Sequence, residues 1–233
     1  MRFVVLVFLL SPHRPASVPK LAAADLSALI LELMSSSNET EIKFRIGEIE
    51  SLLGRLRQLG FQQVTPRTHE MNVLFDLPGH PLRDRGDVLR LRKYGETWVL
   101  THKSKGKNNK KDGPHKTRIE TETRVENGEK MEGILRALQF ETSFRYEKFR
   151  AEWKAPGGEG HVVIDETPIG NFGEIEGPPE WIDSTARDLQ IDRKQYITET
   201  YAGLFFSWKR ETGSGAQEMT FEAVGAGRIK SLS

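Results

Sequence analysis

The sequence predicts an α+β protein in which eight strands form a closed antiparallel β-barrel and helices pack against the outside of the barrel. Charged and apolar residues alternate along most of the chain, as they do on a strand, where successive side chains point to opposite faces. The strand-like segments also follow one another at hairpin spacing, which favours an antiparallel sheet. Closing such a sheet into a barrel removes its exposed edges.

The composition is that of a folded chain rich in ionic groups. Of 233 residues, 37% are hydrophobic and 29% are charged, and the formal net charge is +1. This balance gives no general attraction to nucleic acid or membrane surfaces, so we expect neither as a partner. Cysteine is absent, which excludes disulfides, thiolate zinc sites and a cysteine nucleophile. The remaining oxygen ligands suit Mg²⁺ or Mn²⁺.

Residues 1–37 differ in character from the rest of the chain. Arg2 precedes the apolar run 3–10, which is shorter than the about 20 residues that span a bilayer as a helix. The run has the outline of a weak signal peptide, whereas Met34 offers a second start just before the first charged strand. We interpret residues 1–37 as a disordered leader or a mis-assigned start. We expect a cytoplasmic protein, because nothing later in the chain needs an oxidising compartment.

The first strand shows the alternation most clearly. On a strand, Glu39, Glu41 and Lys43 share one face, whereas Ile42 and Phe44 share the other. A charged face on a single strand usually means only that the face meets water. Because the same alternation returns in later segments, we interpret the charged faces as a common feature of the sheet.

The further elements follow from the spacing of their apolar residues. Helical spacing predicts helices at residues 48–59, 128–138, 178–189 and 194–208. Alternation predicts strands at residues 73–75, 88–92, 97–105, 117–125, 142–154, 161–167 and 170–177. Gly60 ends the first helix, and residues 93–96 and 157–160 form turns. The lysine-rich loop at 106–114 is typical of a solvated connection.

The last part of the chain loses this periodicity. Gly and Ser become frequent after Trp208, so we predict that residues 209–233 form a disordered tail. The folded domain is then expected at residues 38–208. Its apolar strand faces and its helices need a shared core, which leaves the charged strand faces pointing into the barrel.

A charged interior limits what the barrel can hold. Unpaired buried charges cost several kcal/mol each, so the lumen must contain water, opposite charges or a ligand. The inward cations are Lys43, Arg90, Arg92, Lys103, Lys105, Arg118, Lys148 and Arg150, and the inward anions are Glu39, Glu41, Glu120, Glu122, Asp165, Glu174 and Glu176. Arginine forks suit phosphate oxygens, and clustered carboxylates suit a hard divalent cation. The alternative is a set of cross-strand salt bridges on a solvent-facing sheet.

Several of these segments together resemble a known family. Glu39-Thr40-Glu41-Ile42-Lys43 resembles the E-x-E-x-K signature of the CYTH superfamily, the triphosphate tunnel metalloenzymes. Further matches are Arg90-Leu91-Arg92, Lys103-Ser104-Lys105, Glu120-Thr121-Glu122, Lys148-Phe149-Arg150 and the run from Asp165 to Glu176. The resemblance covers about residues 38–208 and is greater to the class IV adenylate cyclase-like branch than to animal thiamine triphosphatases. It implies a closed eight-stranded triphosphate tunnel and marks residues 38–208 as a CYTH catalytic domain.

The resemblance also implies roles for individual residues. It implies an enzyme that uses Mg²⁺ or Mn²⁺ and acts on a small-molecule triphosphate, such as ATP, tripolyphosphate or thiamine triphosphate, as a monomer or homodimer. The implied metal ligands are Glu39, Glu41, Asp165, Glu174 and Glu176. The implied phosphate-binding residues are Lys43, Arg90, Arg92, Lys103, Lys105, Lys148 and Arg150. The implied catalytic residues are Glu41, Lys43 and Glu122.

Two reactions fit such a pocket, and the sequence leaves both open. In hydrolysis, water activated by the metal attacks a terminal phosphorus. In cyclisation, the ribose 3′-hydroxyl of ATP attacks the α-phosphorus and releases pyrophosphate. Some hydrolytic relatives have a tyrosine near the second strand, but residues 72–76 contain none.

Two non-enzymatic alternatives and the histidines complete the interpretation. A non-catalytic polyphosphate-binding module would keep the cations, although retention of the acidic positions argues against it. An RNA-binding barrel would place aromatic residues among the basic ones, and this chain does not. The histidines have no consistent spacing, and we interpret them as surface or incidental residues.

Overall fold

The computed structural model of the chain describes residues 37–105 and 114–230. Eight strands form a closed barrel in the order β1-β5-β4-β3-β2-β6-β7-β8, and each neighbouring pair is antiparallel. The predicted barrel is therefore confirmed. The predicted leader lies outside the described residues apart from Ser37, and most of the lysine-rich loop also lies outside them.

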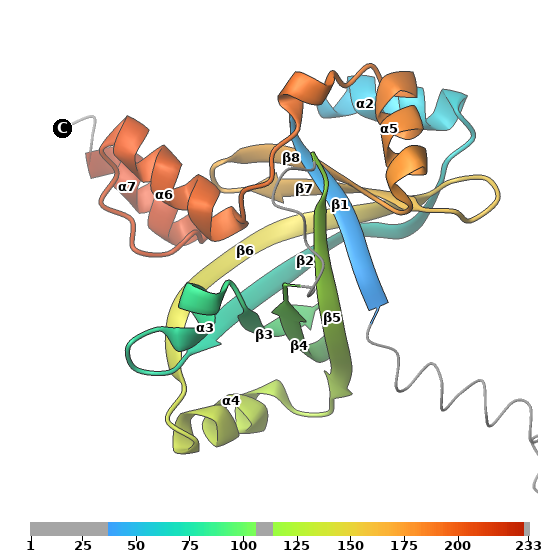
Figure 1. Cartoon of the computed structure of the whole chain (residues 1–233). Helices are drawn as coiled ribbons and strands as arrows, with labels where there is room; N and C mark the ends of the chain where they lie inside the picture. The colour runs from blue at the N-terminus through green and yellow to red at the C-terminus, as the bar shows by residue number, and fades with distance from the viewer. Residues whose placement is uncertain (1–36, 106–113, 231–233) are drawn as a thin grey trace, which may run out of the picture. The chain divides into compact units, whose positions relative to one another are not determined.

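The elements follow one another along the chain as strands with intervening helices (Figure 1). The strands are β1 (Ser37–Ile46), β2 (Gln62–Asp76), β3 (Val88–Tyr94), β4 (Thr97–Ser104), β5 (Lys116–Val125), β6 (Glu141–Lys154), β7 (His161–Thr167) and β8 (Gly170–Glu176). The helices are α2 (Ile49–Gln58), α3 (Pro81–Arg85), α4 (Gly128–Ala137), α5 (Pro179–Asp188), the 3₁₀ helix η1 (Arg193–Gln195), α6 (Tyr201–Thr212) and α7 (Phe221–Lys230).

Strand β2 is much longer than the sequence predicted. It spans 15 residues rather than 73–75, and it pairs with β3 on one side and β6 on the other. Most side chains in its first half, from Gln62 to His69, are at least partly exposed on both faces. Without a buried face that half has no apolar alternation to reveal it.

Two outer cores hold helices against the barrel wall. Ile42 and Phe44 of β1 pack with α2 and α5, including Leu56 and Ile182, in one buried cluster. On another side, Leu135 of α4 joins a smaller cluster formed by the outer faces of β2 and β3. Figure 1 shows α2 and α5 beside each other beyond the ends of β1, β7 and β8. The apolar strand faces therefore point outward, as predicted, and the charged faces point into the barrel.

Helices α6 and α7 pack differently from the outer helices. Phe144 and Tyr146 of β6 lie on the same strand face as Lys148, and both are buried against α6 and α7. The rings of Phe144 and Phe205 are 5.4 Å apart, and those of Tyr146 and Tyr201 are 5.8 Å apart. Because these β6 side chains face inward, α6 covers one end of the barrel interior. Helices α2, α4 and α5 pack against the outer faces of the strands, as predicted, and α6 adds a contact with inward-facing side chains of β6.

The predicted disordered tail is also corrected. Helix α6 continues to Thr212, and α7 follows at Phe221–Lys230. Between and within them, Ala216, Met219 and Val224 are buried against the inward face of β6. The apolar residues of this segment are few and irregularly spaced, so the sequence offered no periodic signal. The prediction for residues 209–233 therefore does not hold for 209–230.

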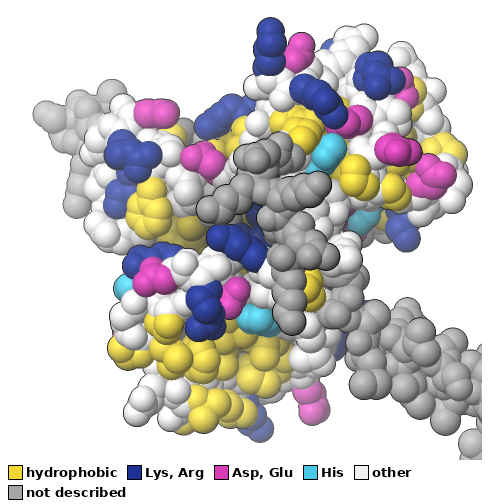
Figure 2. All heavy atoms as spheres, in the orientation of Figure 1, with side chains coloured by type: hydrophobic (Ala, Val, Ile, Leu, Met, Phe, Trp, Pro, Cys, Tyr) yellow, Lys and Arg dark blue, Asp and Glu magenta, His cyan; other side chains and the backbone are white. Residues whose placement is uncertain are grey.

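The surface of the described residues carries one apolar region that stands out. Ile134 and Leu138, in and just after α4, are 53% and 61% exposed. Figure 2 shows apolar side chains gathered around the position of α4 in this view, whereas acidic and basic side chains are interspersed elsewhere on the same face.

Within residues 37–105 and 114–230, no helix combines the length and the apolarity needed to cross a bilayer.

Candidate active site

The inward face of β1 brings acidic and basic groups against β8. In the antiparallel register Glu41 lies opposite Glu176, and Lys43 lies opposite Glu174. Opposed residues of neighbouring strands project from the same face, so all four side chains meet inside the barrel. The Lys43 Nζ donates a 2.6 Å hydrogen bond to Glu174 Oε1, and both groups are buried.

A tight network continues from this pair into β6 and β7. We use the name tight network for Lys43, Lys148, Arg150, Asp165, Glu174 and Tyr201. Arg150 donates through Nε and Nη2 to the two oxygens of Asp165 at 2.7 Å each, and through Nη2 to Glu174 at 2.5 Å. Lys148 and the Tyr201 hydroxyl also donate to Asp165, at 2.8 and 2.5 Å. Asp165 is completely buried, so these bonds replace its hydration.

Two members of the tight network, Glu174 and Lys43, keep their charges in spite of burial. Burial alone raises the pKa of the Glu174 carboxyl, but Lys43, Arg150 and Lys148 together lower this pKa well below its ordinary value. For Lys43, burial lowers the pKa, and the neighbouring carboxylates of Glu174 and Glu41 raise it by more. Burial and the charge of Asp165 raise the pKa of Tyr201 far above its usual value, so its hydroxyl stays a donor.

The opposite side of the interior is paired more loosely. We use the name open arginine wall for Glu70 of β2 and Arg90 and Arg92 of β3. Arg90 lies 3.9 Å from Glu120, and Arg92 lies 3.9 Å from Glu70. The Nε atoms of both arginines are buried, yet they donate to no group that the structure describes. Unfilled, buried guanidinium donors are suited to an anion.

Three carboxylates meet near one end of the interior. Oxygens of Glu39, Glu41 and Glu176 all lie within 4.8 Å of one another, and we call this group the carboxylate cluster. Each member already has a basic partner, because Lys103 donates to Glu39 at 2.6 Å and Lys116 to Glu41 at 2.7 Å. The remaining pair is His161 with Glu176. Three converging carboxylate oxygens fit a hard divalent cation such as Mg²⁺ or Mn²⁺.

Burial and charge act on the cluster in opposite directions. Burial raises the pKa of Glu41, but Lys43 leads a set of cations that lowers it to about 2. Glu39 is different: burial raises its pKa above the ordinary value, although Lys103 partly offsets this. Glu41 is therefore ionised at neutral pH, as a metal ligand must be.

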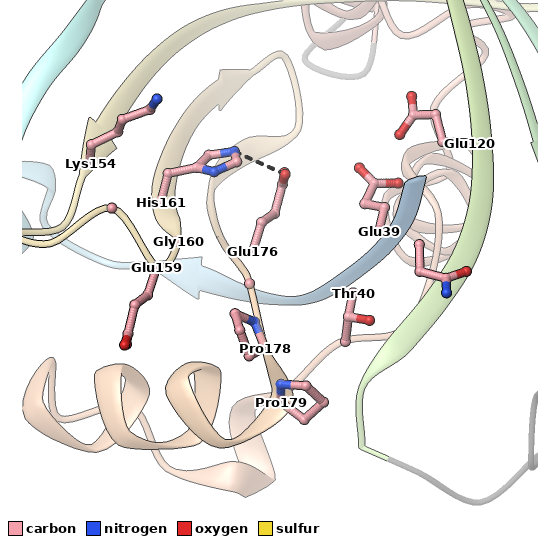
Figure 3. Close-up of a pocket in the computed structure, with 13 residues that line it drawn as sticks. Glu39, Thr40, Glu120, Lys154, Glu159, Gly160, His161, Glu176, Pro178 and Pro179 are labelled. Carbon is pink, nitrogen blue, oxygen red and sulfur yellow. Dashed lines mark ion pairs between the residues drawn. The ribbon is translucent and has the colours of Figure 1, made fainter. Parts of the chain in front are cut away.

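A pocket of about 630 Å³ opens beside the carboxylate cluster. Figure 3 shows Glu39, Glu120 and Glu176 projecting toward this space from three strands, with His161 beside Glu176. The His161 Nε2 lies 2.9 Å from Glu176 Oε2. The hydrogen bond from His161 to Glu176 raises the pKa of the imidazole, although burial opposes this. His161, which we interpreted from the sequence as a surface or incidental residue, lies in this pocket and is partly exposed. No Phe, Tyr or Trp is among the described residues that line the pocket.

The predicted site residues separate into groups in the structure. The carboxylate cluster brings together Glu39, Glu41 and Glu176, three of the predicted metal ligands. The other two, Asp165 and Glu174, lie in the tight network with Lys43, Lys148 and Arg150. Their role as metal ligands stays a prediction. Glu122 is exposed and lies 3.4 Å from Arg92. Lys105 follows the last residue of β4 and is also exposed.

Sequence reasoning missed three interior residues. Glu70 is fully buried on β2, where the predicted strand began only at residue 73. Lys116 opens β5 one residue before the predicted strand. Tyr201 enters from α6, and its ring lies 4.6 and 4.7 Å from the Nζ atoms of Lys43 and Lys148. The alternation Glu70-Met71-Asn72-Val73 was the available signal for Glu70, whereas nothing in a helical pattern marks Tyr201 as inward-facing.

These observations define a closed antiparallel barrel whose lumen is lined by ion-paired carboxylates, lysines and arginines. The CYTH domain family matches residues 37–201 of this chain, which therefore belongs to that family. The membership confirms the resemblance that the charged motifs indicated.

Individual relatives extend this comparison. The chain is 29% identical over 138 residues to a candidate adenylate cyclase of Methanocaldococcus jannaschii, over 59% of this chain and 75% of that protein. A solved structure of a candidate adenylate cyclase from Vibrio parahaemolyticus matches with a TM-score of 0.64 at 16% identity, over 74% of this chain and 99% of the other. A candidate adenylyl cyclase from Hippeastrum, described as having a dominant triphosphatase activity, matches with a TM-score of 0.52 at 21% identity, over 72% and 95%. At these identities the solved structures show a shared fold.

Proposed function

We propose that this protein is a cytoplasmic, metal-dependent triphosphatase that hydrolyses a small-molecule triphosphate inside its barrel, with tripolyphosphate as the first substrate to test. One observation carries the proposal. The carboxylate cluster of Glu39, Glu41 and Glu176 lies in the same closed lumen as a wall of arginines and lysines. Oxygen ligands for a divalent cation and donors for phosphate oxygens are the two requirements for binding a metal–triphosphate complex.

Different residues of the lumen are assigned to bind the metal ion and the phosphate oxygens. We assign Mg²⁺ or Mn²⁺ to Glu39, Glu41 and Glu176; when bound, such an ion neutralises phosphate oxygens and activates water. We assign phosphate oxygens to Arg90, Arg92 and the lysine and arginine donors of the tight network. Asp165 and Glu174, which the family resemblance implies as metal ligands, are better explained as the groups that orient Arg150 and Lys43. Each accepts short bonds at both of its oxygens from at least two side chains, whereas Glu39 and Glu41 each accept one from the described residues.

The chemical step then needs position and charge rather than a nucleophilic side chain. A water oxygen forms a bond to the terminal phosphorus as the bridging P–O bond on the opposite side breaks. The electron pair of that bond leaves with the diphosphate product, whose charge Lys43 and the arginines stabilise. The proton of the attacking water passes to bulk solvent, while Glu41 stays ionised at neutral pH and so remains available to hold the ion.

The pocket favours hydrolysis over cyclisation of ATP. A cyclase must hold the adenine so that the ribose 3′-hydroxyl faces the α-phosphorus, and aromatic rings are the usual platforms for stacking a base. The described lining of the pocket offers carboxylates, His161 and Lys154 but no Phe, Tyr or Trp. The triphosphatase activity described for the Hippeastrum protein supports the same reaction. The description of the Methanocaldococcus jannaschii relative keeps cyclisation as the second candidate.

Phosphate release from tripolyphosphate, ATP and thiamine triphosphate, each with Mg²⁺, with Mn²⁺ or with EDTA, tests the proposal. We expect metal-dependent release of phosphate that Glu41→Gln lowers by about 100-fold, because the variant loses a charged ligand of the ion. Glu166→Gln is the matched control, since Glu166 pairs with Arg67 on the exposed outer face of β7.

Three results would count against the proposal. Cyclic AMP as the main product from ATP would favour the cyclase. Tight binding of tripolyphosphate without any turnover would favour a non-catalytic binding module. An unchanged rate in Glu41→Gln would remove the basis of the metal assignment.

A further inference from the structure

Glu70 is the least satisfied charged group inside the barrel. It projects from β2 into the lumen and is completely buried. Three cations approach it without closing to a short ion pair: Lys148 lies at 3.4 Å, and Arg92 and Arg150 both lie at 3.9 Å. One short bond, 2.9 Å from the Asn72 amide to Oε1, fixes its orientation. Its other oxygen, Oε2, accepts no hydrogen bond from any described residue.

The cations beside Glu70 are equally incomplete. The Nε atoms of Arg90 and Arg92 are buried and donate to no described group, although an unfilled carboxylate oxygen lies in the same wall. By contrast, both oxygens of Asp165 are filled by short bonds from Arg150 and Lys148. Buried polar atoms in folded proteins normally have hydrogen-bond partners. The donors and the acceptor that lack them in this wall therefore indicate a binding site for a polar ligand.

Glu70 is nevertheless a full negative charge. Burial by itself raises the pKa of its carboxyl, but Lys148, Arg150, Arg90 and Arg92 together lower this pKa far below the ordinary value. A phosphate chain drawn to these four cations must therefore approach a fixed carboxylate of its own sign. Two like charges a few ångströms apart in a poorly hydrated lumen repel strongly.

We propose that Glu70 is a resident counter-ion of the phosphate-binding cations: it balances their charge when no ligand is bound, and it competes with phosphate for the same cations. The inference rests on the proposed function and deepens it, because it makes Glu70 the residue that limits how much negative charge an inorganic polyphosphate can bring into the lumen. Glu70 is thus a specificity-determining residue rather than a catalytic one.

The test is the affinity for tripolyphosphate in the presence of EDTA, measured by titration calorimetry without catalysis. Glu70→Gln keeps the shape and the bond from Asn72 but removes the charge, so we expect binding about tenfold tighter or more. Glu70→Asp keeps the charge and is expected to bind within about twofold of the wild type. Glu166→Gln again serves as the surface control. A purely structural role for Glu70 predicts weaker binding, and that result would overturn the inference.

Melting temperature supplies an independent readout. Without anion, Glu70→Gln leaves four cations under-balanced and should melt below the wild type. Tripolyphosphate should then raise its melting temperature by more than it raises that of the wild type. A variant that stays unfolded even with millimolar tripolyphosphate would show that the anion cannot replace the carboxylate. A gain in affinity in Glu70→Asp equal to that in Glu70→Gln would show that charge is not the cause. Either result would refute the proposal that Glu70 is a counter-ion.

The outcome is separable from the proposed function. If the wild type hydrolyses no triphosphate but Glu70→Gln binds tripolyphosphate more tightly, the proposed enzymatic function is wrong and the counter-ion proposal is supported. If hydrolysis is robust and Glu70→Gln gains no affinity, the counter-ion fails and the enzyme proposal stands.

Discussion

The two sides of the barrel interior contain the same kinds of side chain but hold them at different distances. In the tight network, Lys43, Lys148 and Arg150 donate to carboxylates at 2.5–2.8 Å. In the open arginine wall, the arginines lie 3.4–3.9 Å from their nearest carboxylates. Composition alone does not distinguish the two sides, because each combines arginine with acidic residues.

The difference indicates that the two sides respond differently to a ligand. Short, complete hydrogen bonds hold Asp165 and its partners in place before any substrate arrives, which is the preorganisation that electrostatic stabilisation of a transition state requires. The Nε donors of Arg90 and Arg92 have no partner among the described residues and are therefore available to an anion. Substitutions in the tight network should therefore change mainly the free energy of unfolding, and substitutions of Arg90 and Arg92 should change mainly the affinity for the anion.

The largest expected effect is on stability, from Asp165→Asn. Removing this charge leaves Arg150 and Lys148 buried with less compensation, which costs about 3–5 kcal/mol when one partner of a buried pair is lost. Urea unfolding followed by circular dichroism measures it, with Glu166→Gln on the same strand as control. A free energy of unfolding within 1 kcal/mol of the wild type would mean that the tight network does not support the fold, and it would erase the contrast between the two sides.

A smaller effect is expected from Arg92→Ala, and it should appear in substrate binding and not in the free energy of unfolding. Its ion pairs are long, at 3.4 and 3.9 Å, so the free energy of unfolding should change by less than about 1 kcal/mol. Charged hydrogen bonds to phosphate contribute about 1.5–3 kcal/mol, so KM for tripolyphosphate should rise about 10- to 100-fold. Steady-state phosphate release and urea unfolding of the same preparation separate the two quantities. Unfolding as severe as that of Asp165→Asn would contradict the division.

The smallest expected effect comes from Tyr201→Phe, which removes one of several bonds to Asp165. The cost at neutral pH is about 1 kcal/mol. The pKa of Tyr201 is raised in the folded protein above the ordinary value of 10.0, so its contribution is complete below pH 10 and is lost as the pH rises through the folded pKa. The gap between wild type and variant should therefore narrow above about pH 10. A gap that widens there would mean that the hydroxyl is not held protonated by Asp165.

The barrel and the inward direction of its charges were predictable because alternation is a local property of a strand. Glu39, Glu41 and Lys43 show their common face within five residues, and no knowledge of the partner strand is needed. Which carboxylate each cation meets depends instead on strand register. Lys43 bonds Glu174, 131 residues later, and a shift of the pairing would have offered Glu176 in its place. The sequence therefore could not separate the carboxylate cluster from the carboxylates of the tight network.

Two other residues were hidden for different reasons. Glu70 lies on a strand whose first half is exposed on both faces, so the strand itself was shortened in the prediction. Tyr201 belongs to a helix, and helical periodicity shows an apolar face without showing which surface that face covers. Their position inside the lumen depends on the closure of the barrel, which local sequence patterns do not show.

The way α6 and α7 fill one end of the barrel has a practical consequence for how the domain is delimited. The family match stops at residue 201, so a shortened chain ending there would retain every charged motif. It would also strip the cover from Phe144, Tyr146 and Phe172, three large rings turned toward the lumen. Without α6 and α7, these rings would form an exposed hydrophobic surface at the end of an otherwise charged lumen. Such a truncation would be expected to aggregate before its chemistry could be assayed.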